Sequence, residues 1–291
     1  MTSPLIDDAE LAGLLSDPAL RLADTRWYLD EPDRGRAGYD AAHLPGAVFI
    51  DLDRDLTAPQ GPGRHPLRAR ADFAAAMGRF GFGDEHRIVV YDDRSGIIAA
   101  RLWWMLRDLG HETVQVLDGG IVAWMAAGRP VTDTSHPIIP ATLTVRPAAT
   151  RQIDPETLAR RLGTVTVLDA RAPERYRGEV EPIDPVAGHI PTARNAPAVD
   201  NLGPDGRLLP AAQLAARYRR LGGDRDVVAS CGSGVFACHD ILAMTVAGLP
   251  EPILYPGSWS DWSSAGMEAA VGPEPGSREF RVPSSEATGD G

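Results

Sequence analysis

The chain has 291 residues, 43% of them hydrophobic and 24% charged, and its formal net charge is −11. This length allows two domains with separate cores, and the composition is that of a folded globular protein. The negative charge and the lack of a basic run with interleaved aromatic residues exclude a nucleic-acid-binding surface. No apolar run approaches the roughly 18 residues that a membrane span needs, so we expect no membrane contact.

The opening segment MTSPLIDDAE lacks the positive region and apolar stretch of a secretory signal, so we expect a cytoplasmic protein. Two cysteines, Cys231 and Cys238, are too few for a disulfide framework, and we expect both to be free thiols. Histidine and cysteine residues are also too few and too badly spaced for a metal cluster. We therefore predict neither a metal nor a cofactor.

The sequence repeats itself after about 140 residues. The matching segments, in chain order, are RLADTR with VLDAR, HLPGA with HIPTA, IVVYDDRSGIIAA with VVASCGSGVFA, and LDGGIVAW with LYPGSWSDW. Because four segments return in the same order, we interpret the chain as two copies of one domain.

Each copy alternates strand-like and helical patterns. The apolar runs at 87–91 and 226–229 are short and continuous, as is typical of buried parallel strands. Each run is followed by a glycine-bearing turn and then by a helical pattern that stops at Gly110 or Gly248. This order predicts an α/β fold with two similar domains, each a parallel sheet flanked by helices.

Proline-rich and small-residue segments suggest where these domains begin and end. A proline-spaced stretch without a long periodic element separates the copies, and a Pro-, Gly-, Ser- and Glu-rich stretch closes the chain. We expect an N-terminal domain at 1–129, a linker at 130–150, a C-terminal domain at 151–271 and a flexible tail at 272–291.

The segment CGSGVFA, residues 231–237, lies at the end of a predicted strand and leads into a predicted helix. Ligands of open parallel sheets bind at such strand ends. Two glycines permit the unusual backbone angles of the turn, whose N–H groups then form an anion-binding nest at the start of the helix. Such a field stabilises the thiolate of Cys231, which makes it a candidate nucleophile that carries sulfur as a persulfide.

The repeat provides an internal control for this loop. Aligning Gly96 with Gly234 puts Asp93 at the position of Cys231, and an aspartate cannot carry a persulfide. The second domain alone is therefore expected to be catalytic. Cys238 falls on the following helix, where we expect it to pack in the core.

A cysteine at this position has two other interpretations. A buried structural thiol is the commonest fate of a cysteine, but a position at a strand end beside glycines is untypical of it. A cysteine phosphatase has the loop Cys-x5-Arg, and the position of its arginine is Ala237 here. The phosphatase hypothesis thereby loses the bidentate phosphate contact on which it depends.

With these segments in place, the chain resembles the tandem rhodanese family of sulfurtransferases. The resemblance extends from about Asp24 to Gly266; it rests on HLPGA and the following IDLD, RYRG, GHIP, the cysteine loop and GSW. It implies two similar α/β domains with the active site at their interface and the cysteine in the second. We expect the loop residues Gly232, Gly234, Val235, Phe236 and Ala237 to contact the substrate, with the backbone amides of this turn stabilising the thiolate and the persulfide.

The loop also bears on the sulfur donor. Family members that use 3-mercaptopyruvate usually show CGSGVTA, whereas those that use thiosulfate usually carry basic residues after the cysteine. The sequence CGSGVFA resembles the first group, whose proton relay implies roles here for Ser233, His65 and Asp53. Formation of pyruvate needs a proton source, whereas thiosulfate needs none. The alternative for His65, set among Pro62, Gly63 and Pro66, is a surface-loop histidine.

Two positions depart from the mercaptopyruvate pattern. That group holds the donor carboxylate with two arginines, and Arg175 matches the first. The second would fall near Ile183 or Asp184, where no arginine stands. Phe236 replaces a hydroxyl residue that can hydrogen-bond the sulfur. Arg171 follows Asp169 as Arg26 follows Asp24, so we expect a structural ion pair rather than a substrate contact.

The resulting hypothesis is a sulfurtransferase that takes sulfur from a small anionic donor onto Cys231 and passes it to cyanide, a thiol or a thioredoxin-like acceptor. We favour 3-mercaptopyruvate as donor, with a thiosulfate:cyanide sulfurtransferase as the alternative. A rival from another class is a non-catalytic persulfide carrier that docks on a protein partner.

Overall fold

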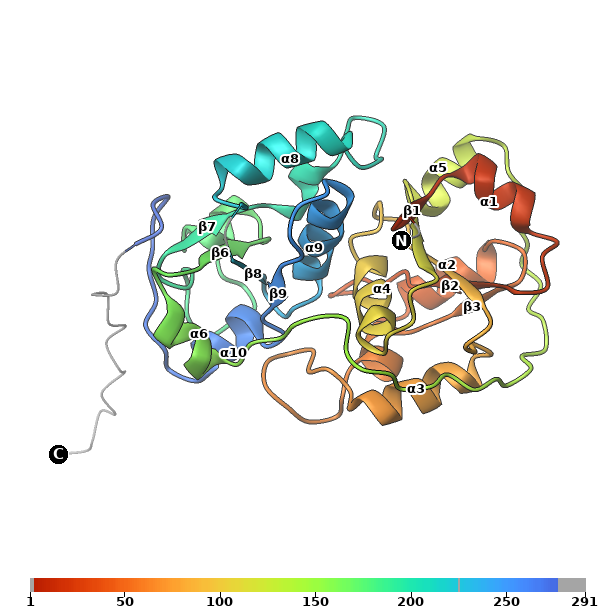
Figure 1. Ribbon diagram of the computed structural model, residues 1–291, viewed down its shortest axis with the longest axis horizontal. Helices are drawn as coiled ribbons and strands as arrows, with labels where there is room; N and C mark the ends of the chain where they lie inside the picture. The colour runs from red at the N-terminus through yellow and green to blue at the C-terminus, as the bar shows by residue number, and fades with distance from the viewer. Residues whose placement is uncertain (1–2, 225, 277–291) are drawn as a thin grey trace.

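The computed structural model describes residues 3–224 and 226–276, and Figure 1 shows two α/β lobes lying side by side. The first half of the chain forms one lobe and the second half forms the other. Each lobe contains one parallel sheet with helices packed around it. The predicted α/β class with two similar domains is confirmed.

The first domain has a five-stranded parallel sheet in the order β1-β5-β4-β2-β3. Its strands are β1 (Leu5–Ile6), β2 (Leu20–Asp24), β3 (Ala47–Phe49), β4 (Arg87–Tyr91) and β5 (Val114–Leu117). Its helices are α1 (Asp8–Leu14), α2 (Arg34–Ala41), the π-helical turn η1 (Leu52–Leu56), α3 (Arg70–Arg79), α4 (Ala99–Asp108) and α5 (Gly120–Ala126).

Side chains of these strands alternate between two apolar layers, as the pleat requires. On one face, Val90 packs with α3 and α4, which contribute Phe73 and Leu102 among others. On the other face, Val89 packs with residues of α1, α2 and α5 such as Trp124. Because both faces are covered, the strands are continuous apolar runs.

The second domain has a four-stranded parallel sheet in the order β7-β6-β8-β9. Its strands are β6 (Thr166–Asp169), β7 (Ala193–Asn195), β8 (Val227–Ser230) and β9 (Ile253–Leu254). Its helices are α6 (Pro155–Arg161), α7 (Pro173–Tyr176), the 3-10 helix η2 (Ala198–Asn201), α8 (Ala211–Arg220), α9 (Phe236–Val246) and α10 (Ser258–Ser264).

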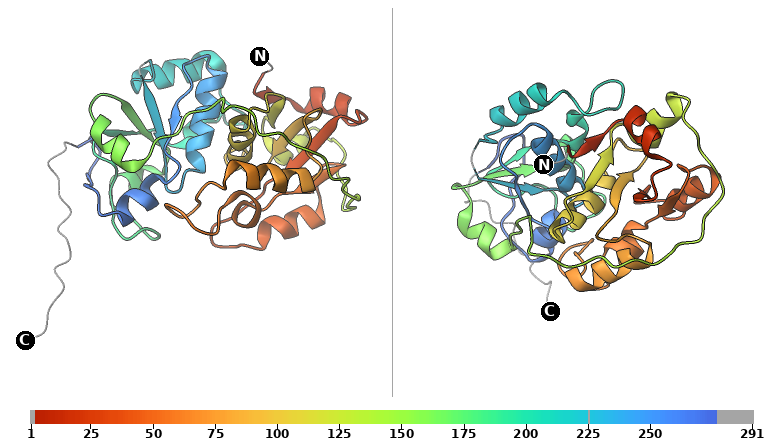
Figure 2. Two further views of the ribbon diagram at one scale, coloured as in Figure 1. Left: turned by 60° about the horizontal axis from the view of Figure 1, so that its bottom comes forward. Right: turned by 45° about the vertical axis from the view of Figure 1, so that its right-hand side comes forward.

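This sheet is also covered on both faces. Leu168 packs with Tyr218 of α8 and Met244 of α9, while Val167 packs on the opposite side with Trp259 and Trp262 of α10. The helices α4 and α9, which follow the equivalent strands β4 and β8, pack against each other where the domains meet (Figure 2). The loops before these two helices consequently face the boundary between the domains.

The connection between the domains runs along the first domain. Its backbone contacts are made by Thr132 to His43, by Ala141 to the carbonyl of Gly78 and by Arg146 to the carbonyl of Leu109. After α10, the chain returns along the second domain, where the carbonyl of Pro275 accepts from Thr192. Most of the predicted flexible tail, residues 277–291, lies outside the described residues. Among those described, no helix is long and apolar enough to cross a membrane.

Candidate active site

Cys231 follows directly on β8 and is 2% exposed. The N–H of Gly234 donates to its sulfur at 3.1 Å, and the backbone N–H of Cys231 donates to Ser258 Oγ at 3.0 Å. Gly234 has φ 76°, and a Cβ there would collide with the carbonyl oxygen of Pro256. The turn therefore requires glycine, and it holds the sulfur against a backbone donor at the start of α9.

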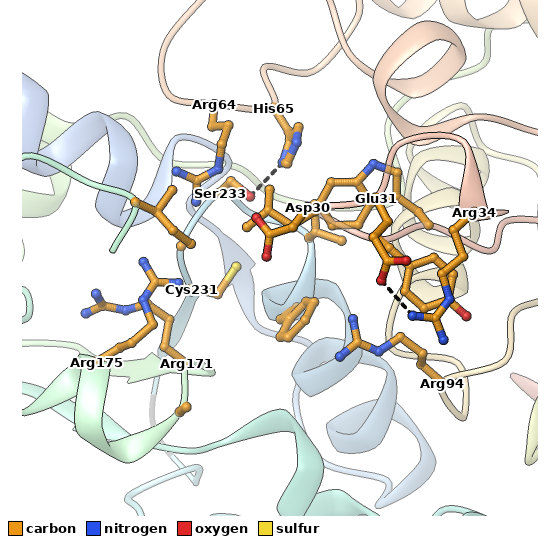
Figure 3. A pocket seen from close by; sticks show the side chains of 18 residues that line it. Asp30, Glu31, Arg34, Arg64, His65, Arg94, Arg171, Arg175, Cys231 and Ser233 are labelled. Atoms are coloured by element: carbon orange, nitrogen blue, oxygen red, sulfur yellow. Dashed lines mark hydrogen bonds and ion pairs between the residues drawn. The ribbon is translucent and has the colours of Figure 1, made fainter. Parts of the chain in front are cut away.

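A cavity of about 510 Å³ opens above this loop and is lined by both domains (Figure 3). The second domain contributes Cys231, Gly232, Ser233, Val235 and Phe236 to the lining. Ala237, by contrast, is completely buried in the core below the loop. The loop residues predicted to bind the donor thus divide into those that line the cavity and those that shape or support the turn.

The three predicted relay residues lie in one hydrogen-bonded chain. His65 Nδ1 is 2.7 Å from Ser233 Oγ, and His65 Nε2 is 3.2 Å from Asp53 Oδ1. Trp27 Nε1 donates to the other oxygen of Asp53 at 2.8 Å and orients that carboxylate. His65 is 4% exposed. The alternative that it is a surface-loop histidine is therefore wrong.

Burial and the neighbouring carboxylate act on the histidine in opposite senses. Burial disfavours the charged ring and lowers the pKa of His65 below its ordinary value, although Asp53 opposes this effect. Hydrogen bonding from His65 is the main cause that lowers the pKa of Asp53. Because the Asp53 carboxylate can only accept a hydrogen bond, the neutral His65 ring carries its proton on Nε2 and donates it to Asp53. The other ring nitrogen, Nδ1, then accepts from the hydroxyl of Ser233.

The loop 62–66 is buried because it inserts against the second domain. The backbone N–H of Arg64 donates to Ser260 Oγ at 3.0 Å, and a Cβ at Gly63 would lie 2.6 Å from the carbonyl oxygen of Gly257. Arg101, fully buried on α4, donates to the carbonyl of His65 at 2.8 Å and to that of Gly234 at 3.1 Å. This first-domain arginine thus connects the histidine loop to the cysteine loop.

Arg175 and Arg171 lie on the other side of Cys231 (Figure 3). Arg171 makes an ion pair with Asp169 at 2.6 Å, as Arg26 does with Asp24, which agrees with the predicted structural pair. Arg175 lies beside Gly232, where a Cβ would be 3.5 Å from its Nη1. The predicted donor-binding arginine is therefore adjacent to the cysteine loop.

Arg64 is a cavity residue that the sequence reasoning missed. A Cβ added at Gly232 would lie 3.2 Å from Arg64 Nη2, slightly closer than the 3.5 Å to Arg175 Nη1. It comes from the first domain, so no motif of the second domain points to it. The available signal was its place directly before His65, because a loop that delivers the histidine to the cavity delivers its neighbour as well.

The remaining cysteine and histidine residues of the motifs pack in the interior. Cys238 is completely buried, its thiol donates to the carbonyl of Gly234 at 3.3 Å, and burial raises its pKa to about 12. His189 stacks on Tyr176 with ring centroids 3.8 Å apart, as His43 stacks on Tyr39 at 3.9 Å. These contacts are structural, and each of the two histidines ties the start of its HLPGA or HIPTA segment to the helix before it.

The first-domain counterpart of Cys231 is Asp92, and the expectation of Asp93 was wrong. The carbonyl oxygens of Asp92 and Cys231 accept equivalent bonds, from Ile121 and Trp259 respectively, at the starts of α5 and α10. Gly96 lies four positions after Asp92, whereas Gly234 lies three positions after Cys231. An alignment without a gap therefore pairs Cys231 with Asp93 instead of Asp92. The carboxylate of Asp93 instead accepts a hydrogen bond from the hydroxyl of Tyr28.

Phe236, half-buried at the start of α9, extends toward the first-domain end of the cavity. The guanidinium of Arg94 lies 5.9 Å from its ring centroid, and Figure 3 shows Arg94 and Arg34 at that end. Within residues 3–224 and 226–276, no group of three or more His, Cys, Asp or Glu side chains is arranged to hold a metal ion. The chemistry of the cavity therefore centres on a thiol, a hydroxyl–imidazole–carboxylate chain and several guanidinium groups.

The Rhodanese-like domain family matches residues 7–127 and 154–265, so both halves of the chain carry this domain. The chain is 47% identical over 270 residues to the probable 3-mercaptopyruvate sulfurtransferase of Pseudomonas aeruginosa, covering 90% of this chain and 95% of that protein. It is 42% identical over 269 residues to the putative thiosulfate sulfurtransferase SseB of Mycobacterium tuberculosis, covering 89% and 94%.

Solved structures give the same assignment. SseA from Escherichia coli, described as a 3-mercaptopyruvate sulfotransferase, has a TM-score of 0.79 and 31% identity, covering 89% of this chain and 100% of that one. The 3-mercaptopyruvate sulfurtransferase from Leishmania major has a TM-score of 0.79 and 31% identity, covering 90% and 74%. The chain therefore belongs to the rhodanese family and is a sulfurtransferase with two tandem rhodanese-like domains.

Proposed function

We propose that this sulfurtransferase takes sulfur from 3-mercaptopyruvate onto Cys231 and passes it to a thiol acceptor. The observation that carries the choice of donor is the chain from Ser233 through His65 to Asp53 beside the cysteine. Thiosulfate offers no atom that needs a proton, whereas release of pyruvate does. The neutral cysteine loop and the name of the Pseudomonas aeruginosa relative support the same donor.

The two domains contribute different parts of this site. The first domain, which we place at residues 1–129, supplies Arg64, His65 and Asp53. The second, at residues 151–271, supplies Cys231, Ser233 and Arg175. Arg64 and Arg175 flank Gly232 and together can bind the carboxylate of the donor, so Arg64 takes the part of the second arginine that the sequence lacks near Asp184.

In the first half-reaction, the thiolate of Cys231 attacks the thiol sulfur of the donor. A sulfur–sulfur bond forms, the carbon–sulfur bond breaks, and its electron pair goes to the enolate of pyruvate. The proton of the donor thiol passes to the Ser233–His65 pair, and the Ser233 hydroxyl delivers a proton to the methylene carbon, which leaves a persulfide anion on Cys231 and pyruvate. The Gly234 N–H, 3.1 Å from the cysteine sulfur, stabilises the anion before and after transfer.

In the second half-reaction, an acceptor thiolate attacks the outer sulfur and Cys231 leaves as a thiolate. The acceptor class that we propose is a thiol, free or on a thioredoxin-like protein in the cytoplasm, with cyanide as the assay substitute. The cavity of about 510 Å³ extends past the cysteine toward Arg94 and Phe236, which leaves room for an acceptor on that side.

The test compares sulfur transfer to cyanide from 3-mercaptopyruvate and from thiosulfate, with Cys231→Ser as the control. We expect kcat/KM to be at least about tenfold higher for mercaptopyruvate, since proton delivery contributes only with that donor. A preference for thiosulfate would reassign the donor. Turnover of neither donor by a folded protein would favour the non-catalytic carrier instead.

A further inference from the structure

Two carboxylates occupy the arginine side of the cavity. Asp184 Oδ1 lies 2.8 Å from Arg64 Nη1, and Asp184 Oδ2 lies 3.0 Å from Arg175 Nη2. Glu181 Oε1 lies 2.7 Å from Arg175 Nη2, and its other oxygen lies 3.4 Å from Arg171. Both carboxylate side chains are almost fully buried, at 4% and 3% exposure. Asp184 thus bridges an arginine of each domain at a place where water barely screens the interaction.

The bridge leaves one N–H group of each arginine directed at the cysteine loop. Arg64 Nη2 and Arg175 Nη1 are the nitrogens nearest to an added Cβ at Gly232, at 3.2 and 3.5 Å. In the described part of the chain, neither nitrogen has a hydrogen-bond partner, whereas Arg64 Nη1 and Arg175 Nη2 are held by Asp184. The carboxylate therefore fixes the two guanidinium groups so that their free donors converge beside Cys231.

The same carboxylates also balance the charge. Arg64, Arg171 and Arg175 carry three positive charges, and Asp169, Glu181 and Asp184 carry three negative charges in direct contact with them. The cluster has convergent N–H donors but no surplus positive charge. Such a site selects its ligand by the geometry of hydrogen bonds rather than by net attraction.

We propose that Asp184 is a specificity-determining residue, which positions Arg64 and Arg175 for a planar monoanionic carboxylate and disfavours a dianionic donor. This inference rests on the proposed mercaptopyruvate function and deepens it. The carboxylate of mercaptopyruvate has one charge and two oxygens that match two adjacent N–H donors. Thiosulfate has two charges and a tetrahedral sulfonate head, so a neutral cluster repays less of its desolvation.

The experiment uses Asp184→Asn, which keeps the size of the side chain but removes its charge and one acceptor oxygen. We expect KM for mercaptopyruvate to rise about tenfold because the arginine pair loses one charge-assisted clamp. KM for thiosulfate should fall, since the cluster gains a positive charge, while kcat for both donors changes little. Inhibition by pyruvate, a carboxylate without the reacting thiol, should weaken in parallel with the mercaptopyruvate KM.

Two matched variants separate this effect from a structural one. Glu179→Gln removes the same charge from the same segment, but Glu179 pairs with Arg177 at the surface, so the donor preference should not move. Asp184→Glu retains the charge and should recover most of the wild-type ratio between the donors. Thermal unfolding of each variant reports whether the fold is intact.

The donor ratio decides the inference. A fall in the mercaptopyruvate-to-thiosulfate ratio of kcat/KM by about tenfold or more in Asp184→Asn supports it. Equal loss with both donors would mean a structural role, and a gain with both would mean that Asp184 competes with the donor; either result overturns it, as does an unchanged ratio. If the wild type transfers sulfur from neither donor, the proposed function fails instead, before any variant is compared.

Discussion

The loops that follow β4 and β8 begin alike, although the first is one residue longer, and in each of them backbone N–H groups point at the first side chain after the strand. In the second domain the Gly234 N–H meets the sulfur of Cys231. In the first domain the carboxylate of Asp92 accepts from four backbone N–H groups at 2.7 to 2.9 Å, those of Arg94, Gly96, Ile98 and Ala99. A completely buried carboxylate is tolerated there because backbone donors replace its water.

The comparison teaches that the nest is a property of the backbone, and that the residue inside it decides the chemistry. An aspartate fills the nest with its own charge and closes it. A cysteine leaves room above the sulfur, where the cavity begins. Burial raises the pKa of Asp92, and the four N–H bonds oppose this effect, so the backbone donors support the charged carboxylate against its burial.

The largest expected effect comes from making the second loop resemble the first. Cys231→Asp should reduce sulfur transfer by about 10³-fold or more, because no persulfide can form on a carboxylate. The fold should survive as well as in Cys231→Ser, because the Gly234 N–H still meets an acceptor. Turnover and thermal unfolding of both variants check this; residual activity above that of the serine variant would contradict it.

A smaller effect is expected from removing the hydroxyl of Ser233 in the second-domain loop. Ser233→Ala should lower kcat/KM for mercaptopyruvate by about 10²-fold, because the proton path to His65 is cut. Turnover of thiosulfate should change little, since it involves no proton transfer to carbon. Parallel steady-state assays provide the measurement, and an equal loss with both donors would show that the serine shapes the loop instead.

The two loop glycines provide a matched pair. Gly234 (φ 76°) and Gly96 (φ 87°) both adopt the left-handed conformation, so the backbone strain of alanine should cost about 1–3 kcal/mol of folding free energy at either position, and the collision with the Pro256 carbonyl should add to this cost at Gly234. Only Gly234→Ala should also lower activity by about tenfold, because the collision of its Cβ with the Pro256 carbonyl would displace the N–H that contacts the reacting sulfur. Urea unfolding and turnover separate the two effects; equal activity loss in Gly96→Ala would break the comparison.

The smallest effect on activity is expected at Asp240, a completely buried residue of α9 whose counterpart on α4 is Leu102. Burial raises the pKa of Asp240 to about 7, while Asn201 and Tyr218 donate to one of its oxygens. Between the two values of its pKa, about 4 in the unfolded chain and about 7 in the folded protein, Asp240 keeps its carboxyl proton only in the folded protein. This group therefore lowers stability as pH rises from about 4 to about 7.

Asp240→Asn mimics the protonated side chain and should remove the loss of stability that Asp240 causes as the pH rises. Its unfolding free energy should exceed that of the wild type by a few kcal/mol at pH 8, and the difference should shrink toward pH 4. Urea titrations at several pH values measure it, with sulfur transfer as the control that should stay unchanged. A difference independent of pH would mean that Asp240 is ionised in the folded state.

Much of the fold follows from local pattern. The predicted strand at 87–91 matches β4, and the predicted helix stops Gly110 and Gly248 have φ 80° and 67° after α4 and α9. These features depend on apolar runs and on glycine, whose signals are contained in a few neighbouring residues. The mistaken pairing of Asp93 with Cys231 arose because one extra loop residue is invisible until strand register is known.

The candidate site was predictable where a motif carries it and not where tertiary contact makes it. Cys231 and Ser233 lie within one loop, so their proximity is local. The loop that carries His65 is held against the second domain by Gly63 and Arg64, whose partners Gly257 and Ser260 lie almost 200 residues away, although the local sequence suggests an exposed turn. The bridge from Asp184 to Arg64 spans 120 residues and joins two domains, so no local pattern encodes it.

The central claim is that sulfur resides on Cys231 between the two half-reactions. Incubation with 3-mercaptopyruvate in the absence of acceptor, followed by mass spectrometry of the intact chain and its peptides, tests it most directly. We predict a gain of one sulfur atom on the peptide carrying Cys231, placed on that residue, released by cyanide and absent from Cys231→Ser. No added sulfur, or sulfur on Cys238, would contradict the account.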